Sequence, residues 1–213
     1  MAKSRLIAEV STQRIEAFSD GVFAIAITLL VLEISVPDLE GVRAHALATA
    51  LLELWPSYFG FVFSFVMIGI YWANHHYIFR LYERSDHAFV LLNILFLMCI
   101  SFLPFPTAVL AEHITDPGQR QNAITLYALG LLLPSFAWFL VWWYASRRNR
   151  LLNPDLDPGF VKSLTQRFAA SVVLYSAALL ISLWSGLASL AVCVGLTFLY
   201  LLPSREPVYR GTG

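Results

Sequence analysis

The chain has 213 residues, of which 58% are hydrophobic and 13% are charged. A soluble globular domain carries about 25% charged residues, so the composition argues against an ordinary soluble domain and favours an integral membrane protein. The net charge is zero and no long basic run occurs, so nucleic acid is not an expected partner. Cys99 and Cys193 lie in apolar stretches without paired spacing, which predicts small buried side chains and no metal site.

Six apolar stretches are long enough to cross a bilayer, which takes about 20 helical residues. In chain order they are expected at Glu16–Val36, Ala48–His76, Ala88–Ala111, Ile124–Ser146, Phe168–Trp184 and Leu187–Pro203. Pro56 is expected to begin or kink the second helix, and Pro104 and Pro106 to kink the third. A tight hairpin at Ser185-Gly186 joins the last two, and the polar segment Arg147–Gln166 is expected to be a loop. The sequence predicts an all-α membrane protein with one six-helix domain over residues 1–213.

The first apolar stretch is expected to be a retained spanning helix and not a cleaved signal peptide. The stretch carries Asp20 and Glu33, and charged residues separate it from the candidate cleavage site Ala44-His45-Ala46.

The basic residues predict the orientation of the helices. If the six helices alternate in direction, twelve basic residues fall on one side of the membrane and two on the other. The larger group is Lys3, Arg5, Arg14, Arg80, Arg84, Arg147, Arg148, Arg150, Lys162, Arg167, Arg205 and Arg210, and the smaller is Arg43 and Arg120. Because short loops rich in Lys and Arg stay in the cytoplasm, both termini are predicted to be cytoplasmic.

The first helix carries a narrow stripe of residues at helical spacing. At 100° per residue the stripe covers about 60° of arc. It consists of Gly21, Ile25, Thr28 and Leu32, with Arg14 on it nearer the helix start and Leu29 on its flank. Asp20 lies about a quarter turn away and Ser19 nearly opposite. Such a stripe fits either a face packed in a core or the lining of a pore, and the spacing alone does not distinguish them.

Two carboxylates in this helix need partners or an interface, because a charge at mid-membrane costs about 2.5 to 3.5 kcal/mol. Asp20 lies about one turn from the cytoplasmic end, where we expect it to bond to Ser19, Arg14 or polar groups of the second helix. Glu33 lies about one turn from the outer end, where it either snorkels to the interface or attracts cations to an outer mouth.

Asn74, His75 and His76 end the second helix at the depth of Asp20. Adjacent histidines point about 100° apart on a helix, and no His pair in the chain has i,i+4 spacing, so a zinc or haem site is not expected. Hydrogen bonding to the first helix is the expected role of these residues.

Arg14-x-x-x-Phe18-Ser19-Asp20-Gly21 on the first helix resembles the R-x-x-x-F-S-D signature of the transmembrane protein 175 family. This family comprises endolysosomal potassium channels and their bacterial relatives. Two further segments are similar to the family, namely Trp72 with Asn74, His75 and His76, and Leu103-Pro104-Phe105-Pro106. The resemblance covers about the first 110 residues, whereas the last three helices match only in number and hydrophobicity.

The resemblance implies an assembly. Animal members carry two six-helix repeats in one chain and work as dimers. A single repeat therefore implies the bacterial branch: a homotetramer in the plasma membrane, with four first helices around a central pore.

The resemblance also implies roles for individual residues. The pore of the family has no carbonyl filter of the T-V-G-Y-G type, and this sequence lacks one too. The implied constriction is an apolar ring of Ile25, with Leu29 and Leu32 further out and hydroxyls of Thr28 between them. Arg14, Phe18, Ser19 and Asp20 are implied to anchor the first helix to neighbouring helices, with His75 and Asn74 as their partners.

Together these features predict a potassium-permeable cation channel that needs no cofactor. An apolar ring closes by dewetting and conducts when it widens. Weak to moderate potassium selectivity would come from partial dehydration at Ile25 and oxygen contacts at Thr28. Glu33, Asp38 and Glu40 would concentrate cations outside.

The alternative is a secondary transporter with a relay of Asp20, Glu33 and the histidines. Such a relay needs acids near mid-membrane, whereas these two lie near opposite ends, roughly 20 Å apart by helical rise. The chain has no G-x-S-x-G, H-E-x-x-H or paired-cysteine motif, so no enzyme is expected.

Overall fold

The computed structural model describes residues 12–37, 46–201 and 206–209. Among these residues, five helical segments are long and apolar enough to cross a membrane, and a shorter apolar helix of 15 residues follows them. The predicted all-α membrane protein is confirmed at this level. The described residues contain only isolated β-bridges in addition to the helices and turns.

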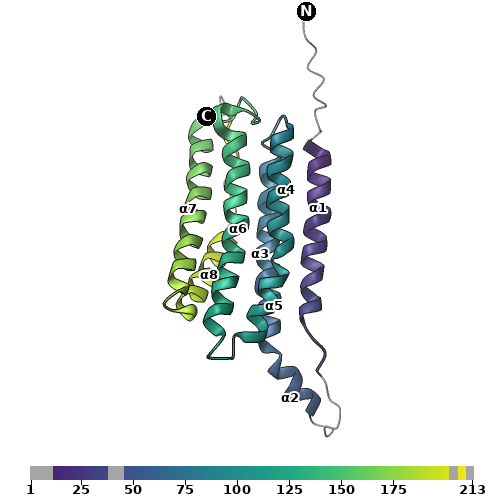
Figure 1. The fold of residues 1–213 in the computed structure, drawn as a ribbon. Helices are drawn as coiled ribbons and strands as arrows, with labels where there is room; N and C mark the ends of the chain where they lie inside the picture. The colour runs from purple at the N-terminus through teal and green to yellow at the C-terminus, as the bar shows by residue number, and fades with distance from the viewer. Residues whose placement is uncertain (1–11, 38–45, 202–205, 210–213) are drawn as a thin grey trace, which may run out of the picture.

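The helices form an elongated bundle (Figure 1). In chain order they are α1 Thr12–Leu29, η1 Leu30–Glu33, α2 Ala46–Glu53, α3 Trp55–Phe79, α4 His87–Phe102, α5 Pro104–His113, α6 Arg120–Ser146, η2 Arg147–Asn149, α7 Pro158–Ser182 and α8 Gly186–Tyr200. The η elements are short 3-10 helices that continue α1 and α6.

Prolines divide two of the expected helices. Pro56 lies in the first turn of α3, so it begins that helix, and α2 is a separate short helix before it. Pro104 has no N–H to donate to the carbonyl of Ile100, and that carbonyl accepts from the Leu103 N–H at 3.1 Å instead. The α-helical hydrogen bonding is consequently interrupted between Phe102, where α4 ends, and Pro104, where α5 starts, at the prolines where a kink is expected.

The expected loop over Arg147–Gln166 is confirmed as far as Asp157 but is wrong for the residues after it, and the expected start of the fifth helix at Phe168 is wrong. α7 begins at Pro158, ten residues earlier, and Asp157 caps it by accepting a hydrogen bond from the Phe160 N–H at 2.8 Å. Asp before Pro is a strong helix start, because Pro fits the first helical position and the carboxylate satisfies a free N–H. The polar residues Lys162, Ser163, Thr165 and Gln166, which suggested a loop, lie in the first turns of this helix.

α6 lies at the centre of the bundle and packs against α4, α5, α7 and α8. Its buried aromatic side chains, Tyr127, Trp138 and Trp142, fill the space between these helices. The Tyr127 hydroxyl lies 2.8 Å from the Ser64 Oγ, which lies 2.7 Å from the Thr107 Oγ1. This buried chain satisfies three hydroxyls and ties α6 to α3 and α5.

Several connections gather at one end of the bundle, the end at which α1 begins (Figure 1). The Asn153 N–H donates to the Leu81 carbonyl at 3.0 Å, which joins the α6–α7 connection to the α3–α4 connection. The Asp157 N–H donates to the Val208 carbonyl at 2.9 Å, so segment 206–209 also returns to this end. Of the basic residues that the structure describes, Arg120 begins α6 at the opposite end. The others belong to this end: Arg14, Arg80, Arg84, Arg147, Arg148, Arg150, Lys162 and Arg167.

The contact between α5 and α6 predicts a stability difference between two glycines. A Cβ on Gly130 would lie 2.8 Å from the Cγ of Pro106, whereas a Cβ on Gly195 would meet nothing within 4 Å. Gly130→Ala should therefore destabilise the protein by about 1 to 3 kcal/mol through overpacking. Gly195→Ala should be neutral or slightly stabilising, because alanine favours a helix over glycine.

Thermal unfolding of the purified protein in detergent measures this difference. Equal melting temperatures for the two variants would contradict the close α5–α6 contact.

Candidate functional site

One face of the first helix packs against the rest of the bundle. α1 lies at the edge of the bundle and packs against α3 and α4 (Figure 1). The side chains buried there are Ile15, Ser19, Phe23 and Ala26 of α1 and Leu30 of η1. Their spacing of four, four, three and four residues is that of one helical face.

The opposite face of α1 is uncovered in the single chain. It carries the predicted stripe of Gly21, Ile25, Thr28 and Leu32 together with the flanking Leu29. Ile25 is 61% exposed and Leu32 is 72% exposed. Packing in the core of one subunit, the alternative explanation of the stripe, is therefore wrong. The Thr28 hydroxyl donates to helix carbonyls, since its Oγ1 lies 3.0 Å from the Ala24 oxygen and 2.9 Å from the Ile25 oxygen.

A buried hydrogen-bond chain connects α1 to α4 and α3. The Asn93 Nδ2 donates to the Ser19 Oγ at 2.9 Å, and the Ser19 hydroxyl donates to the Ile15 carbonyl at 2.8 Å. The His75 Nε2 lies 3.2 Å from the Asn93 Oδ1. Because an amide oxygen can only accept, the His75 Nε2 is the donor in this hydrogen bond. Ser19, Asn93 and His75 are at most 1% exposed, so each of these bonds is made away from water.

Aromatic rings enclose the His75 end of this chain. The imidazole stacks on Phe79 with ring centroids 4.0 Å apart, and Phe23 of α1 meets its edge at 5.5 Å. Phe96 of α4 and Trp138 of α6 lie at 6.2 and 5.7 Å. His75 is thus packed between aromatic rings of α1, α3, α4 and α6.

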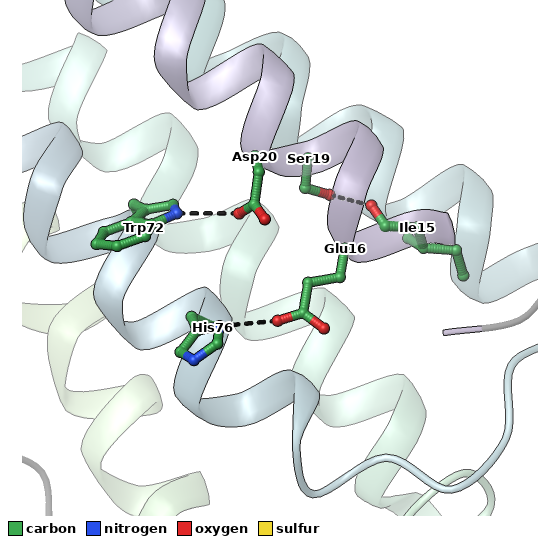
Figure 2. Close-up of polar contacts among 6 residues, drawn as sticks. All are labelled: Ile15, Glu16, Ser19, Asp20, Trp72 and His76. Carbon is green, nitrogen blue, oxygen red and sulfur yellow. Dashed lines mark hydrogen bonds and ion pairs between the residues drawn. The ribbon is translucent and has the colours of Figure 1, made fainter. Parts of the chain in front are cut away.

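Two further polar contacts join α1 to α3 nearer the surface (Figure 2). The Trp72 Nε1 donates to the Asp20 Oδ1 at 2.9 Å, and the His76 Nδ1 lies 2.8 Å from the Glu16 Oε1. A step of four residues forward on α1 matches a step of four residues back on α3, as expected for two antiparallel helices. The expectation that Asp20 has a hydrogen-bond partner on the second helix is confirmed.

Some of the expected anchoring residues contribute to the contacts between α1 and its neighbours, and others do not. Ser19, Asp20 and His75 contribute to the contacts above. Phe18 is 60% exposed and lies on the face of the stripe, as does Arg14. If Phe18 supports the structure, it would do so by contacting another molecule, and its supporting role stays a prediction. Asn74 donates to the Ile70 carbonyl of its own helix and lines a small cavity with Arg167 of α7.

The expectation that His76 hydrogen-bonds to the first helix is confirmed by its contact with Glu16. Three other residues of these contacts, Glu16, Trp72 and Asn93, were not among the predicted site residues. Glu16 and Trp72 could have been found from the spacing, since Glu16 and Asp20 are one helical turn apart, as are Trp72 and His76. Asn93 is a lone polar residue in an apolar helix and gives no indication of its partner.

Acidic residues elsewhere do not assemble into a second site within the described residues. Glu33 ends η1 and is half-buried. Asp38 and Glu40, the other expected outer acids, lie outside the described residues. The part of the chain that the structure describes contains no group of three or more His, Cys, Asp or Glu side chains that could hold a metal ion.

Comparisons with known proteins connect this arrangement to a family. The family model described as "Endosomal/lysosomal potassium channel TMEM175" matches residues 14–104. This range includes the signature on α1 and the residues of α3 and α4 that hydrogen-bond to α1. A potassium channel of Chamaesiphon minutus is 45% identical over 194 residues, which cover 91% of this chain and 95% of that protein. The chain belongs to the TMEM175 family.

A second relative and a solved structure agree with this assignment. A potassium channel of Streptomyces collinus is 43% identical over 156 residues, or 73% of this chain and 75% of that protein. The crystal structure of a lysosomal potassium-selective channel TMEM175 homolog from Chamaesiphon minutus superposes with a TM-score of 0.80 at 43% identity. It covers 90% of this chain and 96% of that one, so the TMEM175 fold extends through the last three helices.

The buried chain predicts a large effect at Asn93. Asn93→Leu is close in size but leaves the His75 Nε2–H buried without its acceptor, which should cost about 1 to 3 kcal/mol. The melting temperature in detergent should fall, and Met98→Leu is the matched control because Met98 is an exposed side chain of the same helix. If Asn93→Leu has the same melting temperature as the wild-type protein, the hydrogen-bond chain does not anchor α1.

Proposed function

We propose that this protein is one subunit of a potassium-permeable channel and that the exposed face of α1 lines the pore. The single observation that carries the proposal is the orientation of α1, which holds its polar partners on one side and leaves the predicted stripe uncovered on the other. Potassium channels of two bacteria are its relatives over most of their length, which supports potassium as the permeant ion.

The composition of the exposed face supports a pore more than a lipid contact. A helix face against lipid is expected to be uniformly apolar, whereas this face includes Arg14, Gly21 and Thr28. Because α1 lies at the edge of the bundle, several copies related by a rotation axis can bring their α1 faces together. We take four copies, the number implied by the resemblance to the bacterial branch.

Conduction would depend on the apolar residues of the stripe. Four Ile25 side chains at the axis form a ring that expels water when narrow and admits hydrated cations when it widens. The Thr28 hydroxyl donates its proton to a helix carbonyl, so the lone pairs of its oxygen remain available to a cation. Leu29 and Leu32 would form further apolar rings. Weak to moderate potassium selectivity would follow from partial dehydration at Ile25, and Glu33 would attract cations at the outer mouth.

We further propose six crossings, with both termini in the cytoplasm of a bacterium. α8 is the sixth crossing despite its 15 residues. Support comes from the hydrogen bond between Asp157 and Val208, since the chain after α8 returns to the end at which α7 began. The basic residues gathered at that end favour the cytoplasmic side of the plasma membrane.

The secondary transporter has less support. The relay would link Asp20 and Glu33 to the histidines, but Asp20 pairs with Trp72, His75 pairs with Asn93, and His76 pairs with Glu16, which is not one of the two acids of the relay. These contacts join helices and do not involve the residues of the exposed stripe. A liposome flux assay distinguishes the two mechanisms, because a channel needs no counter-ion.

Single cysteines test the topology. Gln119→Cys and Asp155→Cys place exposed thiols at opposite ends of the bundle, in a background without the buried Cys99 and Cys193. In intact cells an impermeant reagent should label position 119 and leave position 155 unlabelled until the membrane is permeabilised. Labelling of both positions from outside would contradict the six-crossing topology.

Two isoleucines of α1 test the pore lining. Ile25→Asn should lower the cost of wetting at the ring, so basal potassium flux into liposomes should rise and selectivity over sodium should fall. Ile27 is partly buried against the core, so Ile27→Asn should impair folding without opening a leak.

Both changes place the same amide in the same helix, which controls for general damage. Equal leaks, or a leak through Ile27→Asn alone, would contradict the proposed pore lining.

A further inference from the structure

The end of α6 carries a hollow that the proposed pore does not use. It has a volume of about 330 Å³ and is lined by two aromatic residues and three arginines: Trp143, Tyr144, Arg147, Arg148 and Arg150. The hollow lies where α6 passes into the connection to α7, at the end of the bundle that collects the basic residues.

The backbone of η2 brings the three arginines around one hollow. Arg148 and Asn149 adopt left-handed conformations, with φ of 59° and 50°. This reverses the direction of the chain just after α6, so arginines close in sequence surround one space and do not spread over a helix surface. A left-handed arginine is uncommon, and such conformations concentrate at binding sites.

The aromatic residues hold two of the guanidinium groups in place. Arg147 lies over the Trp143 ring at 5.0 Å and Arg150 over the Tyr144 ring at 4.7 Å. A guanidinium stacked on a ring keeps its N–H groups at the edge, where they can donate. Arg150 also hydrogen-bonds to the Tyr144 side chain, so Arg147 is the stacked arginine with more of its donors available.

The positive charge of the hollow is largely uncompensated. The ion pair of His76 with Glu16 lies between α1 and α3, away from the hollow, and no carboxylate of the described residues forms an ion pair with Arg147, Arg148 or Arg150. Two acids lie close to this part of the chain. Asp86 accepts from the Tyr144 hydroxyl at 2.8 Å and from the Phe89 N–H at 2.9 Å, and the Glu83 N–H donates at 2.9 Å to the carbonyl of Leu151, the residue after Arg150. Both acids are thus on the side of Tyr144 and Arg150, which leaves Arg147 and Arg148 as the main cations.

We propose that this hollow binds the phosphate group of an anionic phospholipid. Guanidinium groups bind phosphate oxygens in pairs of parallel hydrogen bonds. Trp and Tyr at the end of a spanning helix favour the headgroup level of a bilayer, and basic pockets at this level bind anionic headgroups. Free phosphate offers the same oxygens but no acyl chains to lie along the membrane-spanning part of α6, so the lipid is the favoured source. This proposal does not depend on the pore lining.

Lipid retention in native mass spectrometry tests the site. The full-length protein, purified in detergent, is titrated with phosphatidylglycerol, with phosphatidylcholine and with inorganic phosphate. Wild-type protein should retain phosphatidylglycerol in preference to phosphatidylcholine, and inorganic phosphate should not displace it. Arg147→Gln with Arg148→Gln should weaken phosphatidylglycerol binding by about tenfold or more, since each basic residue contributes to headgroup attraction.

Two double variants serve as controls. Arg80→Gln with Arg84→Gln removes the same charge from the same end but outside the hollow, and it should retain the lipid. Arg147→Lys with Arg148→Lys keeps the charge and should retain part of the binding. If both glutamine variants lose phosphatidylglycerol binding equally, the effect comes from net charge alone, and the proposed site is overturned. Displacement of the lipid by inorganic phosphate would overturn the choice of lipid as the ligand.

Discussion

The rotation of α1 about its own axis is the constraint on which the rest of the structure depends. The Ser19–Asn93–His75 chain lies inside the bundle, where a displaced donor or acceptor would lose its partner without gaining water. α1 can therefore not turn without breaking these bonds. Because residues follow one another at 100°, fixing Ser19 toward α4 also fixes Ile25 and Leu32 on the uncovered side.

The anchor and the proposed constriction occupy different halves of the helix. Polar contacts hold α1 from Glu16 to Asp20, whereas in the second half of the helix, as far as the structure describes it, Ala26 and Leu30 pack against the bundle by apolar contacts. Apolar contacts lack directional bonds, so a small displacement of the second half costs less than one of the anchored half. In the proposed channel this difference would let the Ile25 ring widen while the cytoplasmic end of the helix stays in place.

Sequence reasoning predicted the parts of this account that follow from a regular period. The 100° spacing was enough to find the stripe and to place Ser19 opposite it, and the prolines were enough to find the break before α5. It missed the start of α7, because polarity was weighed above the Asp157-Pro158 helix start. It also missed Asn93 as the link between Ser19 and His75, because a contact between helices distant in sequence leaves no local pattern. The exposure of Phe18 could not be predicted either, since a motif does not reveal which of its members face the same chain.

The measurement that tests the central claim most directly is accessibility of single cysteines along α1 during conduction. Positions 21, 25, 28 and 32 are each changed to cysteine and compared with buried positions 23, 26 and 30, in a background without Cys99 and Cys193. The account predicts that a small water-soluble thiol reagent blocks potassium current at the first set and spares the second. Block at the buried positions, or no block at positions 25 and 28 in conducting protein, would contradict a pore lined by the exposed face of α1.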